Sequence, residues 1–360
     1  MERVLTELIA GLRELGHDVT VIARTCELPE GVEVSFHRVR GPGRPFVLAY
    51  PWFLLAGSLA VRRWRRGVVH VTGAIVLNRV DVVAVHYCHQ VGPVNPSRAS
   101  VLHRAQARCA SVLKRRMERV CFRVNRSATF VCVSDGVAAE VRAHYPELAA
   151  RVLTIHNGVD LRAFAPGRCS QHARALRQQL SLGAEQPVAV FVGSEWERKG
   201  LRPLIEALAL APEWALVVAG DGDRRSYEAV AESLGVASSV RWLGVTRDVP
   251  LVYALADAFV LPSAYETFAL VAFEAAASGV PVLATPVSGV RELLRDGENG
   301  FQIARDPRDI ATHLQALAGD PQLRRRLGAA ARAEAQRFSW EQTVARHHEL
   351  YARLAGSGRE

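Results

Sequence analysis

Two carboxylates, Glu266 and Glu274, are the clearest candidates for chemistry in this sequence, and seven residues separate them. An apolar segment, residues 257–261, precedes the pair and is predicted to form a buried strand. Residues 269–278 have the composition of a helix, which Thr267 would cap at its start. We therefore expect Glu266 in the loop after a strand and Glu274 within the following helix.

This arrangement suits a ligand that carries both phosphate and hydroxyl groups. The first amide groups of a helix have no partner inside the helix and lie at the positive end of its dipole, so they attract phosphate. Ala269 and Leu270 would present such amides. Carboxylates on either side would repel a second anion but accept hydrogen bonds from hydroxyl groups. A sugar nucleotide, with hexose, diphosphate and ribose in a row, has this layout.

A second group of candidate residues follows another apolar segment, residues 188–192. After Gly193 the chain places Arg198 and Lys199 side by side, just before an apolar helix. Two cations between a strand and a helix predict an anion site. Lysine is rare in this arginine-rich chain, so a lysine here indicates that a compact charge is needed. No Asp-x-Asp pair stands after an early strand, and we expect no metal ion or other cofactor.

The two carboxylates and their surroundings, Pro-Ser-Ala-Tyr-Glu-Thr-Phe and Ser-Gly-Val-Pro-Val, resemble the Glu-x7-Glu motif of the retaining GT-B glycosyltransferases of family 4. The resemblance implies that Glu266 holds the donor sugar and that Glu274 holds the ribose diol. It also implies that the diphosphate meets the backbone of four consecutive residues, which are Phe268, Ala269, Leu270 and Val271.

Residues of the second group match the same family. The resemblance implies that Arg198 and Lys199 grip the diphosphate, beside the loop of Gly193 and Ser194. Many members carry an arginine where Ser194 stands, whereas Arg198 resembles a known Arg-Lys-Gly variant of the pattern. A further strand, ending at Gly244 and Val245, would line the base pocket through its backbone.

The resemblance also implies a histidine that faces the donor sugar after a buried strand of the first domain. Position matching gives His86, and His89 is the second candidate. A purely structural histidine is the alternative at either position.

The order of predicted elements indicates an α/β protein, because strands alternate with helices throughout. Together with the resemblance, this implies a GT-B fold of two Rossmann-like, doubly wound domains facing a cleft. Residues 1–165 would form the N-terminal, acceptor-side domain, and residues 166–338 the C-terminal nucleotide-sugar domain. Residues 339–360 would form a helix that packs back on the first domain. Within this scheme, the polar residues 165–186 are interpreted as the linker and the entry to the second domain.

The family pattern begins with a strand and a glycine-rich loop, whereas this sequence begins at Met1-Glu2-Arg3, already in a predicted helix. The first strand of the N-terminal domain is therefore expected to be missing, through a misassigned start codon or a truncation. Such a strand would be central in a doubly wound sheet.

Positive charge is concentrated in the first half of the chain. Residues 1–165 carry 23 basic and 13 acidic side chains, a balance of +10, while residues 166–360 carry 22 and 23, a balance of −1. A membrane surface or an anionic acceptor would fit this asymmetry. Nucleic acid is not expected, because no nucleic-acid-binding motif is present. Six scattered cysteines and the absence of a signal peptide indicate a reduced, cytosolic protein.

Residues 46–61 form an apolar run that ends in four arginines around Trp64. The run is short for a membrane span and contains Pro51, so a buried helix is the favoured interpretation. The alternative is a helix lying in the interface of a bilayer.

These observations predict a retaining, metal-independent glycosyltransferase that moves a sugar from a UDP- or GDP-linked donor to a glycan or lipid-linked acceptor of the cell envelope. We expect it in the cytoplasm, with possible peripheral contact to the inner face of the membrane. Two alternatives stay open: a sugar-nucleotide-binding protein with impaired turnover, and a GT-B sugar-nucleotide epimerase.

Overall fold

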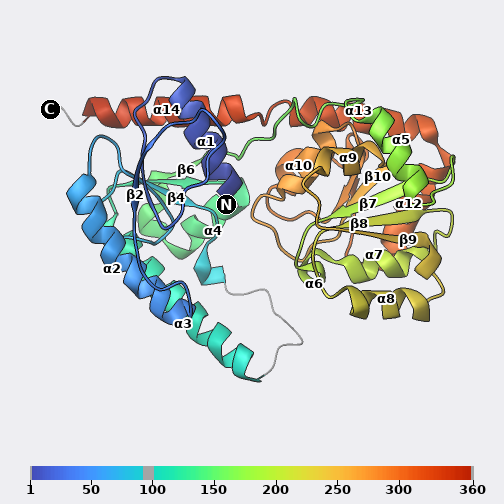
Figure 1. The fold of residues 1–360 in the computed structure, drawn as a ribbon, viewed down its shortest axis with the longest axis horizontal. Helices are drawn as coiled ribbons and strands as arrows, with labels where there is room; N and C mark the ends of the chain where they lie inside the picture. The colour runs from blue at the N-terminus through green and yellow to red at the C-terminus, as the bar shows by residue number, and fades with distance from the viewer. Residues whose placement is uncertain (1, 92–100, 358–360) are drawn as a thin grey trace. The chain divides into compact units, whose positions relative to one another are not determined.

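The computed structural model describes residues 2–91 and 101–357 and divides into two compact units (Figure 1). The first unit comprises Met1–Gly158 together with Trp340–Glu360, and the second comprises Val159–Ser339. The boundaries thus fall at 158/159 and 339/340, where the sequence suggested 165/166 and 338/339.

The second unit is built around one parallel sheet of six strands in the spatial order β12-β11-β10-β7-β8-β9. Its central strands are apolar along their whole length and buried at every position, as is typical of parallel strands covered on both faces. The strands are β7 (Val188–Val192), β8 (Ala215–Ala219), β9 (Val240–Gly244), β10 (Ala258–Leu261), β11 (Val282–Ala284) and β12 (Gly300–Gln302).

Helices cover this sheet on both faces (Figure 1). Helices α7, α8 and α12 bury their apolar residues against one face in a shared core, and α9 and α10 lie on the other. The helices are α5 (Ser170–Gln179), α6 (Trp196–Lys199), α7 (Leu201–Leu208), α8 (Arg224–Ser233), α9 (Val249–Ala254), α10 (Leu270–Ala277), α11 (Val290–Leu293), α12 (Pro307–Gly319) and α13 (Pro321–Ala335), with a short 3-10 turn, η3 (Ala237–Ser239).

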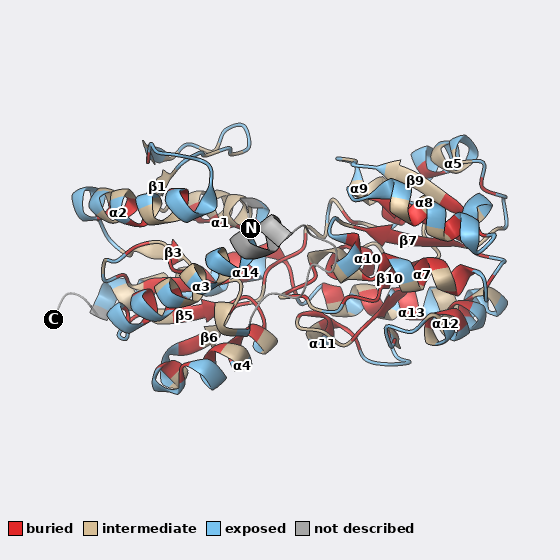
Figure 2. Cartoon of the chain, turned by 90° about the horizontal axis from the view of Figure 1, so that it is seen from below, coloured by how far each residue is buried: buried red, intermediate tan, exposed pale blue. Residues whose placement is uncertain are grey.

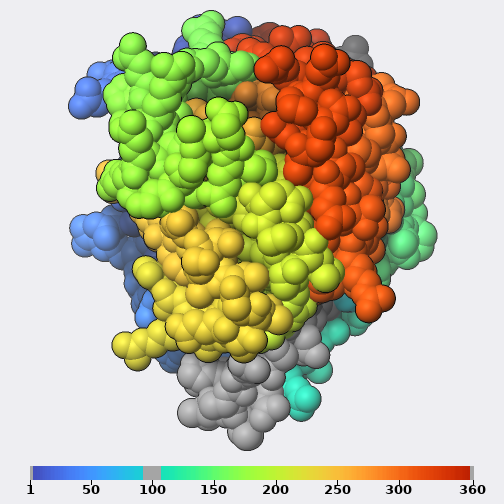
Figure 3. Space-filling view, turned by 90° about the vertical axis from the view of Figure 1, so that its right-hand side faces the viewer, coloured from blue at the N-terminus to red at the C-terminus, as the bar shows by residue number. Residues whose placement is uncertain are grey.

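The polar segment 165–186, predicted to be the linker and the entry to the second domain, lies within the second unit. It folds into α5, which packs against α9, and Figure 3 shows the segment in green on the surface of this unit. Arg177 fastens its end by donating to the Gly183 carbonyl at 2.7 Å, and Arg241 of β9 donates to the Leu180 carbonyl at 2.6 Å. Polar composition alone did not reveal these backbone contacts.

The first unit contains two separate parallel sheets, β1-β2 and β3-β4-β5-β6. Among residues 2–91 and 101–357, no strand joins them. The elements are α1 (Glu2–Glu14), β1 (Thr20–Ala23), β2 (Ser35–Arg38), α2 (Phe46–Trp64), β3 (His70–Thr72), β4 (Val82–Val85), η1 (His89–Val91), α3 (Val101–Val124), β5 (Thr129–Cys132), α4 (Asp135–His144), η2 (Pro146–Arg151), β6 (Val152–Thr154) and α14 (Trp340–Ser357).

The C-terminal helix α14 is an integral part of this first unit. Val344 packs with Leu8 and Leu12 of α1, and Leu350 packs with Val82 and Val131 of the four-stranded sheet. Burial of these side chains removes apolar surface from water, which stabilises the unit through contacts between the two ends of the chain.

The apolar run at residues 46–61 forms α2, but the prediction of a buried helix is wrong. Its inner face is buried through Ala49, Leu54, Gly57 and Val61, whereas its outer face stays exposed, as the pale blue stretches of α2 in Figure 2 indicate. An apolar run predicts a hydrophobic helix, but it does not predict whether one face or all faces of that helix are buried. Among the described residues, no helix is long and apolar enough to cross a membrane.

Candidate functional site

The candidate residues of the second unit gather where the strand order of its sheet reverses. β8 and β9 lie on one side of β7, while β10 and the strands after it lie on the other. Lys199 follows β7 and Glu266 follows β10, so both stand beyond the carboxyl ends of these two adjacent strands. In open α/β sheets, ligands bind at such a reversal point.

Glu266 forms ion pairs with both predicted cations. Its Oε1 atom lies 2.9 Å from Lys199 Nζ and 3.0 Å from Arg198 Nη1. The side chains of Glu266 and Lys199 are only 9% and 12% exposed, so water screens this pair weakly. Burial alone would raise the pKa of Glu266, but the two cations outweigh it and hold the pKa below its usual value. The carboxylate is therefore ionised at neutral pH.

Further contacts fix this cluster in place. Ser263 donates to Glu266 Oε1 at 2.9 Å, and Thr285 donates in turn to the Ser263 carbonyl at 2.6 Å. Arg198 donates to Glu195 at 2.8 Å and to the carbonyl of Tyr265. The roles of Ser263 and Thr285 were not predicted, although Ser263 stands two residues after β10 and Thr285 directly after β11, which was the available signal.

Gly193 makes room for the lysine. It has φ of +139°, and a Cβ atom there would lie 2.8 Å from Lys199 Cε. Its carbonyl accepts a hydrogen bond from Trp196 Nε1 at 2.8 Å, which anchors the loop, while Ser194 is exposed. A glycine is needed because any side chain would displace the lysine stem.

Helix α10 begins at Leu270, one residue later than predicted, and it lacks the predicted side-chain cap. The residue before it is Ala269, in the left-handed conformation (φ 46°, ψ 52°), and it forms no side-chain cap; Thr267 is therefore not the N-cap. Glu195, before α6, is also left-handed at φ 57°. A non-glycine residue in this region costs about 1–2 kcal/mol, and such strain tends to concentrate at functional sites.

Glu274 lies inside α10 and is only 4% exposed. Tyr253 of α9 donates to its Oε2 atom at 3.4 Å and to the Val271 carbonyl at 2.9 Å. Tyr253 thereby ties the start of α10 to the second carboxylate. Its role was not predicted, because the contact joins two helices whose packing the sequence does not specify.

Two more loops belong to this edge of the sheet. Gly244 ends β9 with φ of +73°, and its carbonyl accepts from the Gly220 amide at 2.8 Å, while Val245 is 77% exposed. In the loop after β11, Gly289 approaches Phe268 so closely that a Cβ atom would lie 2.4 Å from the Phe268 carbonyl oxygen. The segment predicted to meet phosphate is thus in close backbone contact with a glycine of this loop.

The candidate histidines lie in the first unit. His86 directly follows β4, and its pKa is lowered to about 4, mainly by burial and further by the nearby His347. Its neighbourhood includes His70, whose ring stacks on that of His347 with centroids 5.9 Å apart. His89 lies in η1, and burial and the charge of Lys114 lower its pKa to about 4. Both imidazoles are therefore neutral at pH 7.

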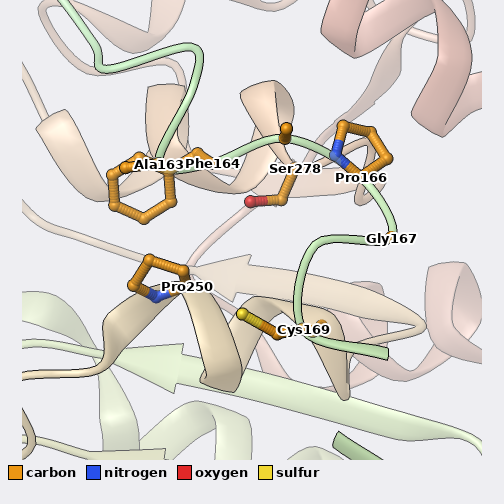
Figure 4. A pocket seen from close by; sticks show the side chains of 9 residues that line it. Ala163, Phe164, Pro166, Gly167, Cys169, Pro250 and Ser278 are labelled. Atoms are coloured by element: carbon orange, nitrogen blue, oxygen red, sulfur yellow. The ribbon is translucent and has the colours of Figure 1, made fainter. Parts of the chain in front are cut away.

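A small cavity in the second unit lies beneath the end of α10 (Figure 4). Its volume of about 20 Å³ is enough for one water molecule. The cavity therefore does not hold a sugar nucleotide, and it contains none of the predicted donor-binding residues. Its lining includes Phe164, Pro166, Cys169, Pro250 and Ser278.

Comparison with solved structures places the fold in one class. The chain superposes on WaaG, a glycosyltransferase involved in lipopolysaccharide biosynthesis, with a TM-score of 0.79 over 97% of this chain and 95% of that one, at 22% identity. It superposes on Anabaena Alr3699/HepE, solved with UDP-glucose, with a TM-score of 0.70 over 97% and 95%, also at 22% identity. The protein thus has the GT-B fold of two Rossmann-like domains.

Sequence comparison identifies the family. Residues 1–163 match the model of Glycosyltransferase Family 4, and residues 173–334 match that of Glycosyl transferases group 1. D-inositol 3-phosphate glycosyltransferases of Geodermatophilus obscurus and Jonesia denitrificans are 33% and 31% identical over 78% of this chain. The chain spans 63% of the former and 68% of the latter. It belongs to the family 4 glycosyltransferases.

Proposed function

We propose that the protein transfers a sugar, with retention of configuration, from a UDP- or GDP-linked donor to a glycan or lipid-linked acceptor. The observation that carries this proposal is the cluster of Lys199, Arg198 and Glu266 at the reversal point of the sheet, beside the start of α10. The crystal structure of HepE contains UDP-glucose, which supports a UDP-sugar.

In the proposed mechanism, the bond between the anomeric carbon and the donor phosphate breaks, and the nucleoside diphosphate departs. The acceptor oxygen bonds to the same face of the sugar, and its proton passes to a donor phosphate oxygen. Lys199 and Arg198 stabilise the charge on the departing diphosphate, together with the amides of residues 268–271. Fixed charges act strongly here because the lysine is largely shielded from water.

Glu266 has a second task in this proposal. Without a donor it neutralises both cations, and a bound diphosphate would share or replace these contacts. The carboxylate could then accept hydrogen bonds from sugar hydroxyl groups, while Glu274 accepts from the ribose diol. Gly193, Ser194, Gly244 and Val245 would contribute backbone contacts to the donor. His86, as a neutral imidazole, is proposed to contact the donor sugar.

The proposal includes metal independence, since Lys199 and Arg198 would supply the positive charge that a metal ion would otherwise give. It also places the protein in the cytoplasm, in peripheral contact with the membrane through its basic first half and active in cell-envelope glycan synthesis.

The test is a screen of UDP- and GDP-sugars for donor hydrolysis, with and without EDTA. We expect slow hydrolysis of at least one donor, unchanged by the chelator. Loss of activity in EDTA that Mg²⁺ restores would overturn metal independence. The divided sheet of the first unit favours one alternative, a binding protein without turnover. Micromolar binding of a nucleotide sugar with no hydrolysis and no transfer would support that alternative.

A further inference from the structure

The two faces of helix α2 differ in what covers them. Ala49, Leu54, Gly57 and Val61 are buried against the rest of the first unit. Turned away from them, the side chains of Leu48, Trp52, Leu55 and Leu59 are 62%, 52%, 59% and 68% exposed. These four follow a spacing of four, three and four residues, which places them in one stripe along the helix. We call these four residues the outer stripe.

The charge around the outer stripe has one sign. Arg62 and Arg63 lie in the last turn of α2 beyond Leu59, Arg66 follows the end of the helix, and all three are exposed. Between Glu33 and Glu118 the sequence holds 14 basic side chains and one acidic one, Asp81, a balance of +13. This stretch contains both α2 and α3, which lie against each other in the first unit.

Lys114 of α3 is one of these basic side chains, and its ammonium group lies 4.8 Å from the centre of the Phe46 ring at the start of α2. A contiguous set of exposed leucines and a tryptophan is unusual on a soluble surface and marks an interaction site. Leucine and tryptophan beside arginines suit the boundary between lipid headgroups and acyl chains. The surplus positive charge suits anionic headgroups.

We propose that the outer stripe of α2 docks the protein on an anionic lipid bilayer, with the helix lying along the surface. Leu48, Leu55 and Leu59 enter the acyl boundary, Trp52 sits at headgroup level, and the arginines beyond Leu59 meet the lipid phosphates. The charge complementarity favours lipid over a second copy of the chain, whose α2 region would carry the same positive charge. Docking through α2 specifies the membrane contact named in the proposed function and rests on that part of it, but it involves the first unit alone and does not depend on donor chemistry.

The test measures partition onto vesicles by sedimentation. The probes are phosphatidylcholine vesicles with and without about 40 mol% phosphatidylglycerol, a fraction that gives a clearly negative surface potential. Wild type should sediment with the anionic vesicles and at least tenfold less with neutral ones. The double variant Leu55→Glu/Leu59→Glu should lose at least tenfold in partition, and Arg62→Glu/Arg63→Glu should lose a similar factor at low salt.

Leu15→Glu is the matched control, because Leu15 is 52% exposed in the same unit but outside α2. It should bind vesicles like wild type. All variants should keep the wild-type unfolding temperature and donor hydrolysis, so that failed binding is distinguishable from failed catalysis or folding. Wild type that stays in the supernatant with anionic vesicles would overturn the proposal. Normal vesicle binding by Leu55→Glu/Leu59→Glu would also overturn it. The same holds if wild type is a dimer that this double substitution dissociates.

Discussion

Two regions of the molecule depart from the usual pattern of apolar side chains inside and charged ones outside. They are the cluster of Lys199, Arg198 and Glu266 in the second unit and the outer stripe of the first. The cluster buries charged groups, whereas the stripe exposes apolar ones. Burying charge is costly unless it is paired, and here Glu266 pairs both cations. In the stripe, Trp52 donates to the Arg40 carbonyl at 2.8 Å, but the apolar side chains of all four residues stay more than half exposed. The charged cluster is therefore stable without its ligand, whereas the outer stripe can be removed from water only by an external partner.

Replacing the lysine of the cluster should have the largest effect. Lys199→Ala removes the charge nearest to the departing diphosphate, so kcat should fall by about 10²–10³-fold, as is typical for loss of one electrostatic stabiliser. Donor hydrolysis or transfer at saturating donor measures it. Lys114→Ala, which changes the other lysine of the chain, should leave kcat unchanged. A fall of less than threefold in Lys199→Ala would remove Lys199 from the mechanism.

Removing the second carboxylate should act on binding instead. Glu274→Ala deletes an acceptor for the ribose diol, so the donor KM should rise at least tenfold, in keeping with about 1.5–3 kcal/mol for a hydrogen bond to a charged group. Glu298→Ala, at an exposed carboxylate in a turn, is the control. An unchanged KM in a folded Glu274→Ala protein would contradict the assignment.

Neutralising the first carboxylate tests whether the ligand-free cluster competes with the diphosphate. Glu266→Gln should weaken transfer but tighten binding of free UDP or GDP by about threefold to tenfold, because less charge then holds Lys199 and Arg198. Calorimetric titration measures the Kd. Glu195→Gln, which changes an exposed carboxylate that pairs with Arg198, should have the smaller effect. Weaker nucleotide binding in Glu266→Gln would show that the carboxylate does not compete.

The smallest expected effect is a pH dependence of stability in the first unit. Burial lowers the pKa of His70 to about 3 and of His86 to about 4. The folded protein therefore protonates these two side chains at a lower pH than the unfolded chain does. Stability should therefore be full above about pH 6.5 and decline as the pH falls toward 4. Thermal unfolding between pH 7 and pH 4.5 measures this decline. His86→Gln should make the decline shallower, and an equally steep one would exclude His86 as a source.

Much of the second unit was predictable because its signals are local. The strands at β7, β10 and β11 are short apolar runs bounded by glycine, proline or charged residues, and they form where expected. The start of α10 was not predictable, because the left-handed conformation of Ala269 is imposed by packing. Close contact of Gly289 with Phe268, from a distant part of the chain, belongs to that packing.

Sequence by itself determined the alternation of strands and helices, the two carboxylates at their spacing, and the concentration of positive charge in the first half. These are properties of residue order, and short-range periodicity is enough to express them. Only the tertiary structure decided that one oxygen of Glu266 pairs with two cations of α6, of which Lys199 lies 67 residues away in the chain. It also decided that α2 keeps one face in water. Both depend on which segments meet in space, and residue order within each segment does not fix that.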